Sequence, residues 1–474
     1  MIWHIIRKEM LENFLSLRFI LSLLLIISLF AAGGFVFVDE YSQQLQDYWK
    51  KTNKNLSGLS EQSSQLYELA FYKQRIFRKT KTLALCAEGF EKSLPNCFEF
   101  DVFTADLPEI KGQSNFTVPH FSDIDWVFVI SLVLSFVALV FAYDSICGEK
   151  EAGTLRLMLA GAIPRHKVLF GKYFGTMVTL GIPLLIGLLV NLIIVVSSED
   201  IVFDGNVWLK IFTIILLSFL YLSIFVLLGL FISSRTAHSA NCMVILLLLW
   251  VGLVILIPSF GRIISDASYD MPTQEEFERM KGEAHDQIDQ NALNGKYGPF
   301  ASSFNPDLDS PYANPPARAR FDNALADAQN RITEGHHNQM LAQAFVGRNF
   351  TCISPVVIYQ RAGETIAGTG LNHCVNLYRQ IRQYQADLKE YIRSKDSEDP
   401  ESLHLLSPMK MAVKNWGTIS KQPVRFDSVP KFQERDLALG ESLKLAIWDI
   451  GLLILFNLVF FAAAYVSFLK YDVR

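Results

Sequence analysis

The stretch richest in residues suited to chemistry is 144–172, DSICGEKEAGTLRLMLAGAIPRHKVLFGKY. Its glycines permit tight turns among acids and bases, and Pro164 ends the short apolar run that follows. In that run Leu155, Met158 and Leu159 would share one helical face, with Thr154 as its cap. A charged elbow of this kind favours docking a partner and moving the attached segments, although it could be only a basic anchor that fixes topology. The elbow residues are Asp144, Gly148, Glu149, Lys150, Glu151, Gly153, Thr154 and Leu155.

Motifs for nucleotide or metal chemistry are missing from the sequence. Gly171-Lys172 is followed by Tyr173, and no P-loop glycine precedes it at the required spacing. There is no H-E-x-x-H, and His336-His337 are adjacent rather than four residues apart. A G-x-S-x-G elbow is absent too. We therefore predict no catalytic residues, no metal site and no cofactor bound by this chain. The net charge of −4 gives no basic footprint for nucleic acid.

The six cysteines divide by position. Cys86 and Cys97 fall in one long polar segment, and Cys352 and Cys374 fall in another. An oxidising exterior would let each pair form a disulfide bond, which would close a short loop. The alternatives are four unpaired side chains or, less favoured, metal ligands. Cys147 and Cys242 lie at the ends of apolar stretches, where they are expected to stay thiols.

Long apolar stretches flank the elbow and the cysteines and are expected to fix their positions. The chain is 51% hydrophobic and only 19% charged, and its apolar residues are clustered. Crossing a bilayer requires about 20 apolar residues, which predicts a membrane protein rather than one large soluble core. The six predicted spans are 15–38, 124–143, 168–197, 207–232, 239–260 and 444–468.

Lysine and arginine in the short loops predict the orientation. The elbow, 144–167, and the loop at 233–238 are basic, whereas 198–206 has no Lys or Arg. Both termini and the elbow are therefore expected in the cytoplasm. Residues 1–14 resemble an amphipathic helix lying at the interface. The first span is longer than the apolar core of a signal peptide, which argues against that alternative.

Two long segments, 39–123 and 262–443, are then extracytoplasmic and hold more than half of the chain. The first is predicted to extend the first span as a helix, with a break near Asn53–Ser60 before a second helix. Helical patterns follow at 273–293, about 315–348 and 371–395. Residues 396–443 are expected to return irregularly, with room for short strands. The predicted fold is a mainly α membrane protein with six transmembrane helices, N-in/C-in, whose two mostly helical outer segments pack as one domain.

Polar groups within the spans are few, which argues against an ion-coupled carrier. Asp449 is expected to cap or pair with another helix rather than to take part in transport. Asn191 and Asn457 are expected to form hydrogen bonds between helices.

The elbow string resembles the cytoplasmic loop of type 2 ABC exporter permeases. Gly148 to Glu151, Gly153 to Leu155, Arg165 and Gly171-Lys172 match its recurring positions. More narrowly, the chain resembles the bacterial branch with large outer insertions after the first and fifth spans. Four stretches carry that narrower resemblance: AEGFEKSLPN (87–96), FSDIDWVF (121–128), SPVVIYQRAGETIAGTGL (354–371) and PVRFDSVPKF (423–432).

The resemblance implies a permease subunit of a bacterial cytoplasmic (inner) membrane. It would work as a dimer with a second copy or a homologous permease, surrounded by membrane lipid. Separate cytoplasmic ABC ATPase subunits would hold ATP and Mg and drive it through the elbow, including Arg165 and Lys172. We consider export of a hydrophobic, lipid-like or peptide substrate first. Mechanotransmission to an extracytoplasmic partner is the alternative, and a receptor or scaffold without ATP coupling is a third.

Overall fold

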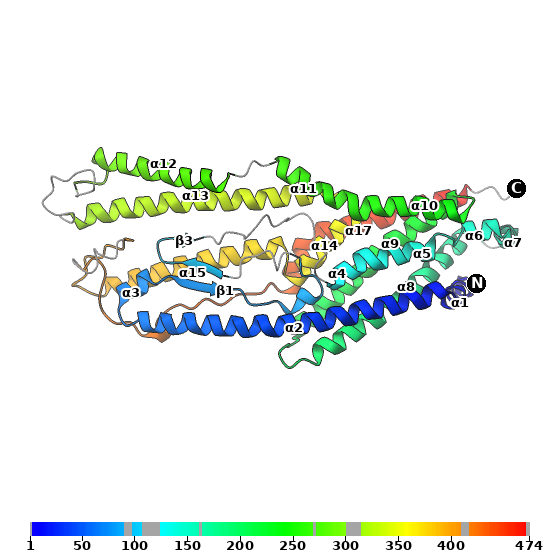
Figure 1. The fold of residues 1–474 in the computed structure, drawn as a ribbon, viewed down its shortest axis with the longest axis horizontal. Helices are drawn as coiled ribbons and strands as arrows, with labels where there is room; N and C mark the ends of the chain where they lie inside the picture. Colours follow the sequence, from blue (N-terminus) through cyan, green and yellow to red (C-terminus); the bar gives the residue numbers. More distant parts are fainter. Residues whose placement is uncertain are drawn as a thin grey trace.

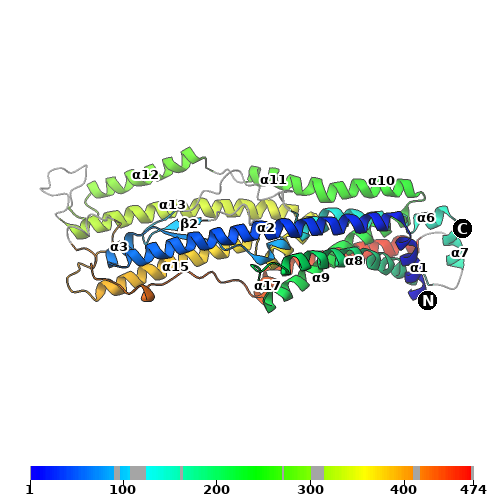
Figure 2. The ribbon, with the colours of Figure 1, turned by 60° about the horizontal axis from the view of Figure 1, so that its bottom comes forward.

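The computed structural model describes residues 2–89, 97–106, 124–160, 164–268, 272–299, 314–408 and 417–470. The molecule is elongated, with both ends of the chain and the elbow at one tip (Figures 1 and 2). Parts of several predicted segments lie outside the described residues: 90–96 and 107–123 of the first outer segment, 269–271, 300–313 and 409–416 of the second, and 161–163 of the elbow.

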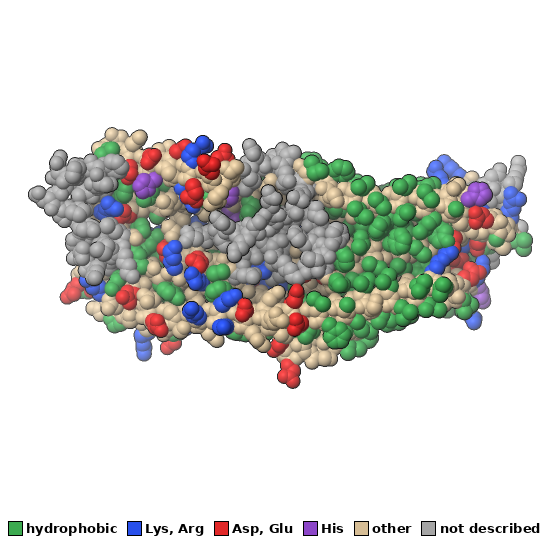
Figure 3. Space-filling view, in the orientation of Figure 1, with side chains coloured by type: hydrophobic (Ala, Val, Ile, Leu, Met, Phe, Trp, Pro, Cys, Tyr) green, Lys and Arg blue, Asp and Glu red, His purple; other side chains and the backbone are tan. Residues whose placement is uncertain are grey.

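Six helices among the described residues are long and apolar enough to cross a membrane, as predicted. They are α2 (Leu17–Gln62), α4–α6 (Trp126–Glu151), α8 (Arg165–Val196), α9 (Gly205–Arg235), α10–α11 (Ser239–Gly261 in its spanning part) and α17 (Leu439–Leu469). Apolar side chains cover the surface of this half of the molecule (Figure 3). A short helix, α1 (Ile2–Phe14), precedes them.

Two spans contain π-helical turns. The second span comprises α4 (Trp126–Phe128), the π-helical η3 (Val129–Leu134) and α5 (Ser135–Ala142). The fifth comprises α10 (Ser239–Trp250), the π-helical η4 (Val251–Leu256) and α11 (Ile257–Ser268). The Trp250 indole donates a hydrogen bond of 2.9 Å to Ser135 Oγ, so the two irregular regions lie together.

The first span continues without a break into the half of the molecule that lies away from the elbow, which is called the outer half below (Figure 1). Ser16 caps α2 by accepting from the Phe19 N–H at 3.3 Å, and the helix runs for 46 residues. The break predicted near Asn53–Ser60 is therefore wrong. Leu59 is only 1% exposed within a cluster that includes Leu66 and Ile392, and this packing outweighs the weak local helix preference.

The outer half is mainly helical. The predicted helices appear as α12 (Gln274–Leu293), α13 (Pro315–Phe350) and α15 (Leu371–Ser397), alongside the short α3 (Leu66–Phe71). A capping box between Thr273 and Glu276 begins α12. Between the end of α15 and the start of α17, the described residues 398–408 and 417–438 are irregular apart from the 3₁₀ turn η6 (Phe426–Ser428), as expected.

A small antiparallel sheet was not predicted. Its strands are β1 (Gln74–Phe77), β2 (Cys97–Phe100) and β3 (Ala105–Asp106), in that order. Gln74 lies opposite Phe100, and Glu99 opposite Asp106. The sheet packs its buried Ile76, Phe98 and Phe100 against α15.

A second unpredicted element is the buried helix α14 (Pro355–Ala367), which follows the 3₁₀ turn η5 (Thr351–Ile353). It enters the span bundle and packs against α9 and α17. The Tyr359 ring stacks on Tyr221 with centroids 4.5 Å apart, and its hydroxyl lies 2.8 Å from Ser218 Oγ. The outer half is thus anchored inside the bundle.

The polar span residues form the expected contacts between helices. Asn191 donates to the Phe30 carbonyl at 2.7 Å and accepts from the Trp126 indole at 2.9 Å. Asn457 donates to the Leu220 carbonyl at 2.9 Å. These contacts confirm the predicted structural role of both side chains.

The two predicted disulfide bonds are wrong: all six cysteines are free. Cys86 is fully buried beside the spans, after the 3₁₀ turn η1 (Thr82–Leu85), whereas Cys97 begins β2 on the outer sheet. Cys352 lies in η5 before α14, whereas Cys374 lies on α15 after it and packs against Leu341 and Ala344 of α13. A disulfide needs Cα atoms closer than about 7 Å. Short sequence separation did not bring these sulfur atoms together.

Candidate functional site

The elbow consists of two short helices at the tip that also holds α1 (Figure 1). These are α6 (Cys147–Glu151) and α7 (Thr154–Ala160). Gly153 joins them with φ +70°, a conformation that favours glycine. Gly148 lies inside α6 and makes no turn, contrary to our expectation.

The second helix of the elbow has one buried side and one exposed side. Leu155 is fully buried, whereas Leu157 is 82% exposed and Arg156 is also exposed. Thr154 is exposed, and its hydroxyl lies 3.4 Å from the Glu149 carbonyl rather than at a helix N–H. The outward side of α7 therefore offers an apolar and basic surface to a partner.

A buried ion network joins the elbow to α1 and α8. Lys172 is 1% exposed, and its ammonium lies 2.6 Å from Glu9 and 3.1 Å from Glu149. Lys172 also donates to the Ser145 carbonyl at 2.7 Å, and Lys8 pairs with Glu149 at 3.0 Å. Burial raises the pKa of Glu9, and the Lys172 ammonium opposes that rise. A charge buried in this way is stable only while its partners stay in place.

Sequence reasoning missed Glu9, which lies on the same helical face as Ile5 and Ile6. A carboxylate on an apolar face was the signal that a buried cation would face it. Glycines on α8 admit this face of α1: a Cβ added to Gly171 would lie 2.6 Å from Ile5, and one added to Gly175 would lie 2.7 Å from Glu9.

Other elbow charges bind the ends of further spans. Lys150 donates to the carbonyls of Ser234 and Thr236 at 2.5 and 3.0 Å, where α9 ends. Cations stabilise such helix C-termini. Glu151 accepts from the N–H of Ser239 at 2.9 Å, where α10 begins. Negative charge is favourable at that helix end.

Two more contacts complete this arrangement. Asp144 pairs with Arg18 near the start of α2 at 2.8 Å. Arg165 hydrogen-bonds the Leu469 carbonyl at the end of α17. The structure thus brings the predicted charged residues of the elbow into contact with the middle of α1, the first part of α8 and the ends of α2, α9, α10 and α17. This arrangement can transmit a displacement. In the described part of the chain, no group of three or more His, Cys, Asp and Glu side chains is suited to hold a metal ion.

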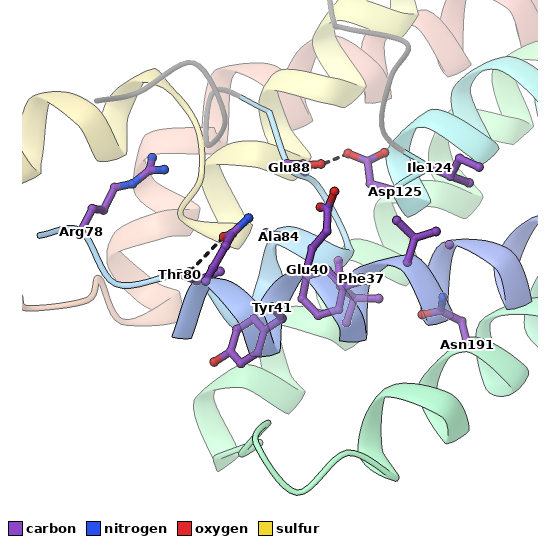
Figure 4. Close-up of a pocket in the computed structure, with 14 residues that line it drawn as sticks. Phe37, Glu40, Tyr41, Arg78, Thr80, Ala84, Glu88, Ile124, Asp125 and Asn191 are labelled. Carbon is purple, nitrogen blue, oxygen red and sulfur yellow. Dashed lines mark hydrogen bonds between the residues drawn. The ribbon is translucent and has the colours of Figure 1, made fainter. Parts of the chain in front are cut away.

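A cavity of about 160 Å³ lies near the opposite end of the spanning part of α2 (Figure 4). Val36, Phe37 and Ile124 form its apolar side, and Glu40 and Glu88 line its polar side. Ligand pockets usually exceed about 300 Å³. The cavity is therefore large enough for a small head group rather than for a whole lipid.

The polar side of this cavity is ordered by hydrogen bonds. Asp125 accepts from the Glu88 N–H at 2.8 Å and from the Phe128 N–H at 2.6 Å, so it caps α4. Thr80 donates to Gln44 at 3.0 Å.

Comparison with known proteins gives a family match over nearly the whole chain. A family model described as ABC-2 family transporter protein matches residues 3–473. Two similar proteins, from Stutzerimonas stutzeri and Pseudomonas aeruginosa, bear the name "Probable ABC transporter permease protein NosY". Each is 36% identical over 76 residues, which is 16% of this chain and 28% of the relative. The matched region thus spans less than a third of these relatives.

Proposed function

Because the chain belongs to the ABC-2 family of transporter proteins, we propose that it is a permease subunit driven by separate ABC ATPase subunits through the elbow. The observation that carries this proposal is the division of roles within the elbow. Its charged side chains bind span ends, while α7 turns Leu157 and Arg156 outward. Pressure on α7 would therefore move several spans together.

The proposal assigns the nucleotide chemistry to the partners. ATP and Mg would bind to the ATPases, and the permease would pair with a second copy or a homologous permease. The elbow and both chain ends would face the bacterial cytoplasm, with the outer half across the inner membrane. The position of the elbow and chain ends at one tip supports this orientation, as do the basic short loops.

The first candidate activity is export of a hydrophobic, lipid-like or peptide substrate. The cavity supports it, because apolar Val36 and Ile124 are also exposed on the surface of the spanning half. An amphiphile could place its polar group beside Glu40 and Glu88. The two long segments outside the spans, 39–123 and 262–443, would be part of the same export complex.

The second candidate activity is mechanotransmission, which α14 favours. Ser354 at its start donates to the Leu253 carbonyl within η4 at 2.5 Å. Arg348 on α13 pairs with Glu364 on α14 at 2.6 Å, with both side chains about nine-tenths buried. Movement of the spans would thus reach the long outer helices directly.

Co-purification tests the coupling proposal. We expect the affinity-tagged full chain to retain an ABC ATPase from its own organism, and Leu157→Glu to reduce the recovered ATPase about tenfold or more. A tenfold loss corresponds to about 1.4 kcal/mol, which is within the range for a contact at the centre of an interface. Leu403→Glu is the matched control, because Leu403 is 49% exposed in the outer half. Equal recovery with both variants, or no ATPase with the unmodified chain, would contradict the proposal.

Reconstituted vesicles containing the complex separate the two activities. Export predicts ATP-dependent movement of a labelled amphiphile across the bilayer. Mechanotransmission predicts ATP hydrolysis without such movement, together with an ATP-dependent change in the distance between spin labels on α12 and α17.

A further inference from the structure

Two cysteines that the coupling proposal does not use meet where the elbow packs on the fifth span. Cys147 begins α6 and Cys242 lies in the first turn of α10, and both are fully buried. The helices α6 and α10 are in contact, and the two thiol groups are close enough to influence each other. An independent contact agrees with this placement, because Cys147 Sγ lies 3.6 Å from Ser239 Oγ, one helical turn before Cys242.

The surroundings favour thiol chemistry. Lys150 interacts electrostatically with both sulfur atoms while it holds the end of α9. A nearby ammonium stabilises a thiolate, the form that attacks an oxidant. The neighbouring small polar side chains are hydroxyls, Ser233, Thr236 and Ser239, which could form hydrogen bonds but could not be oxidised in this way.

We propose that Cys147 and Cys242 are an oxidisable pair, which a hydroperoxide converts to a disulfide bond that fastens the elbow to the fifth span. One thiol reduces hydrogen peroxide and becomes a sulfenic acid, releasing one water. The second thiol attacks that sulfur, forming the S–S bond and releasing a second water. Two thiols are thus oxidised and one peroxide is reduced to two waters.

Burial determines when this reaction occurs. The oxidant reaches the sulfur atoms only when α6 moves away from α10, and the bond closes when the two helices pack again. The oxidised pair would then hold the elbow in its packed position. The chemistry needs only this chain, whereas its consequence for coupling rests on the proposed function.

The test uses the purified full chain in detergent, treated with hydrogen peroxide and then denatured and alkylated. We expect two of the six thiols to lose alkylation, and peptide mass mapping to find Cys147 joined to Cys242. Dithiothreitol should restore both thiols. Cys242→Ser should abolish the joined peptide, while Cys352→Ser, at a partly exposed thiol, should leave it unchanged.

Hydrogen exchange supplies the second readout. After oxidation the backbone of α6 and α7 should exchange more slowly than in the reduced chain, and Cys242→Ser should show no such change. The inference is overturned if this pair remains alkylatable after peroxide treatment, whether or not other cysteines are oxidised. It is also overturned if the bond forms but exchange in the elbow does not change. Both readouts are independent of any ATPase, so failure to recover an ATPase leaves their outcome unaffected.

Discussion

Lys172 shows how much one side chain contributes to the elbow. Its ammonium is almost fully buried between Glu9 and Glu149, on three different elements. Removing one partner from such a network leaves charge buried without compensation, at a cost of about 3–5 kcal/mol. We therefore expect Lys172→Met to lower the free energy of unfolding by this amount, measured by denaturant titration in detergent.

Lys172→Arg is the matched control, because it keeps the positive charge. It should cost less than the methionine variant, although the larger head group must fit a tight site. Equal stability of Lys172→Met and the unmodified chain would show that the network does not stabilise the elbow.

Lys81 predicts how the outer half responds to acid. It forms ion pairs with Glu434 and Asp436 where the outer half meets the spans. Burial raises the pKa of Asp436, but the Lys81 ammonium lowers it, and the net shift is downward. A depressed acid pKa contributes stability above the unfolded-state pKa, and this stability is lost as the pH falls through the folded-state value.

Replacing Lys81 with Met removes the influence that lowers the pKa of Asp436. Acid unfolding of the outer half should then begin at a higher pH than in the unmodified chain, which a near-ultraviolet circular dichroism titration would measure. An additional Asp436→Asn substitution should reduce that difference. The same acid midpoint with and without Lys81 would contradict this assignment.

For single residues, the sequence indicated which side chains form the charged elbow, but it did not indicate which distant side chains they contact. The elbow residues could be predicted because acids, bases and glycines are concentrated in one short loop. Glu9 could have been noticed on the apolar face of α1, but its contact with Lys172 spans 163 residues. The two predicted disulfide bonds were wrong for the same reason, because tertiary packing decides which sulfur atoms lie close together.

A buried ion pair joins the helix α14 to the last span. Arg361 on α14 pairs with Asp449, which is 3% exposed within α17. This confirms that Asp449 pairs with another helix. Arg361→Met should lower the free energy of unfolding by about 3–5 kcal/mol, because a carboxylate would remain buried without its cation.

A double-mutant cycle tests this pair. Adding Asp449→Asn to Arg361→Met should recover most of the lost stability, because the neutral amide costs less to bury than the carboxylate. Additive losses in the double variant would show that the two side chains act independently.

Spans and long outer helices could be predicted because their apolar patterns are long. The helix α14 could not, since its 13 residues include Arg361 and Glu364 and are too few for a span. Its burial depends on the ion pairs that other elements supply. The strands of the outer sheet have four residues or fewer, which gives too little alternation to recognise.

In the proposed orientation, the two ends of the molecule are exposed on opposite sides of the membrane. The helix α7, which contains Leu157, and the helix α12, which contains Leu293, lie toward opposite ends of the long axis (Figure 1). In cells with a permeable outer envelope, Leu293→Cys should react with a membrane-impermeant maleimide. Leu157→Cys should react only after the inner membrane is opened.

The unmodified chain, with its six native cysteines, supplies the background labelling in this experiment. Labelling of Leu157→Cys in sealed cells would place the elbow outside and contradict the proposed orientation. The separation of apolar and polar halves could be read from the sequence, but the contact of α14 with the spans could not.

The uninterrupted α2 has a mechanical consequence. Its 46 residues make a rod about 69 Å long, held near its base by the contact of Arg18 with Asp144 and at its far end by Leu59. A tilt of about 5° at the base would carry the distant tip sideways by about 6 Å. The rod would thus amplify a small rotation at the inner surface into a sweep at the far tip, without any refolding along the way.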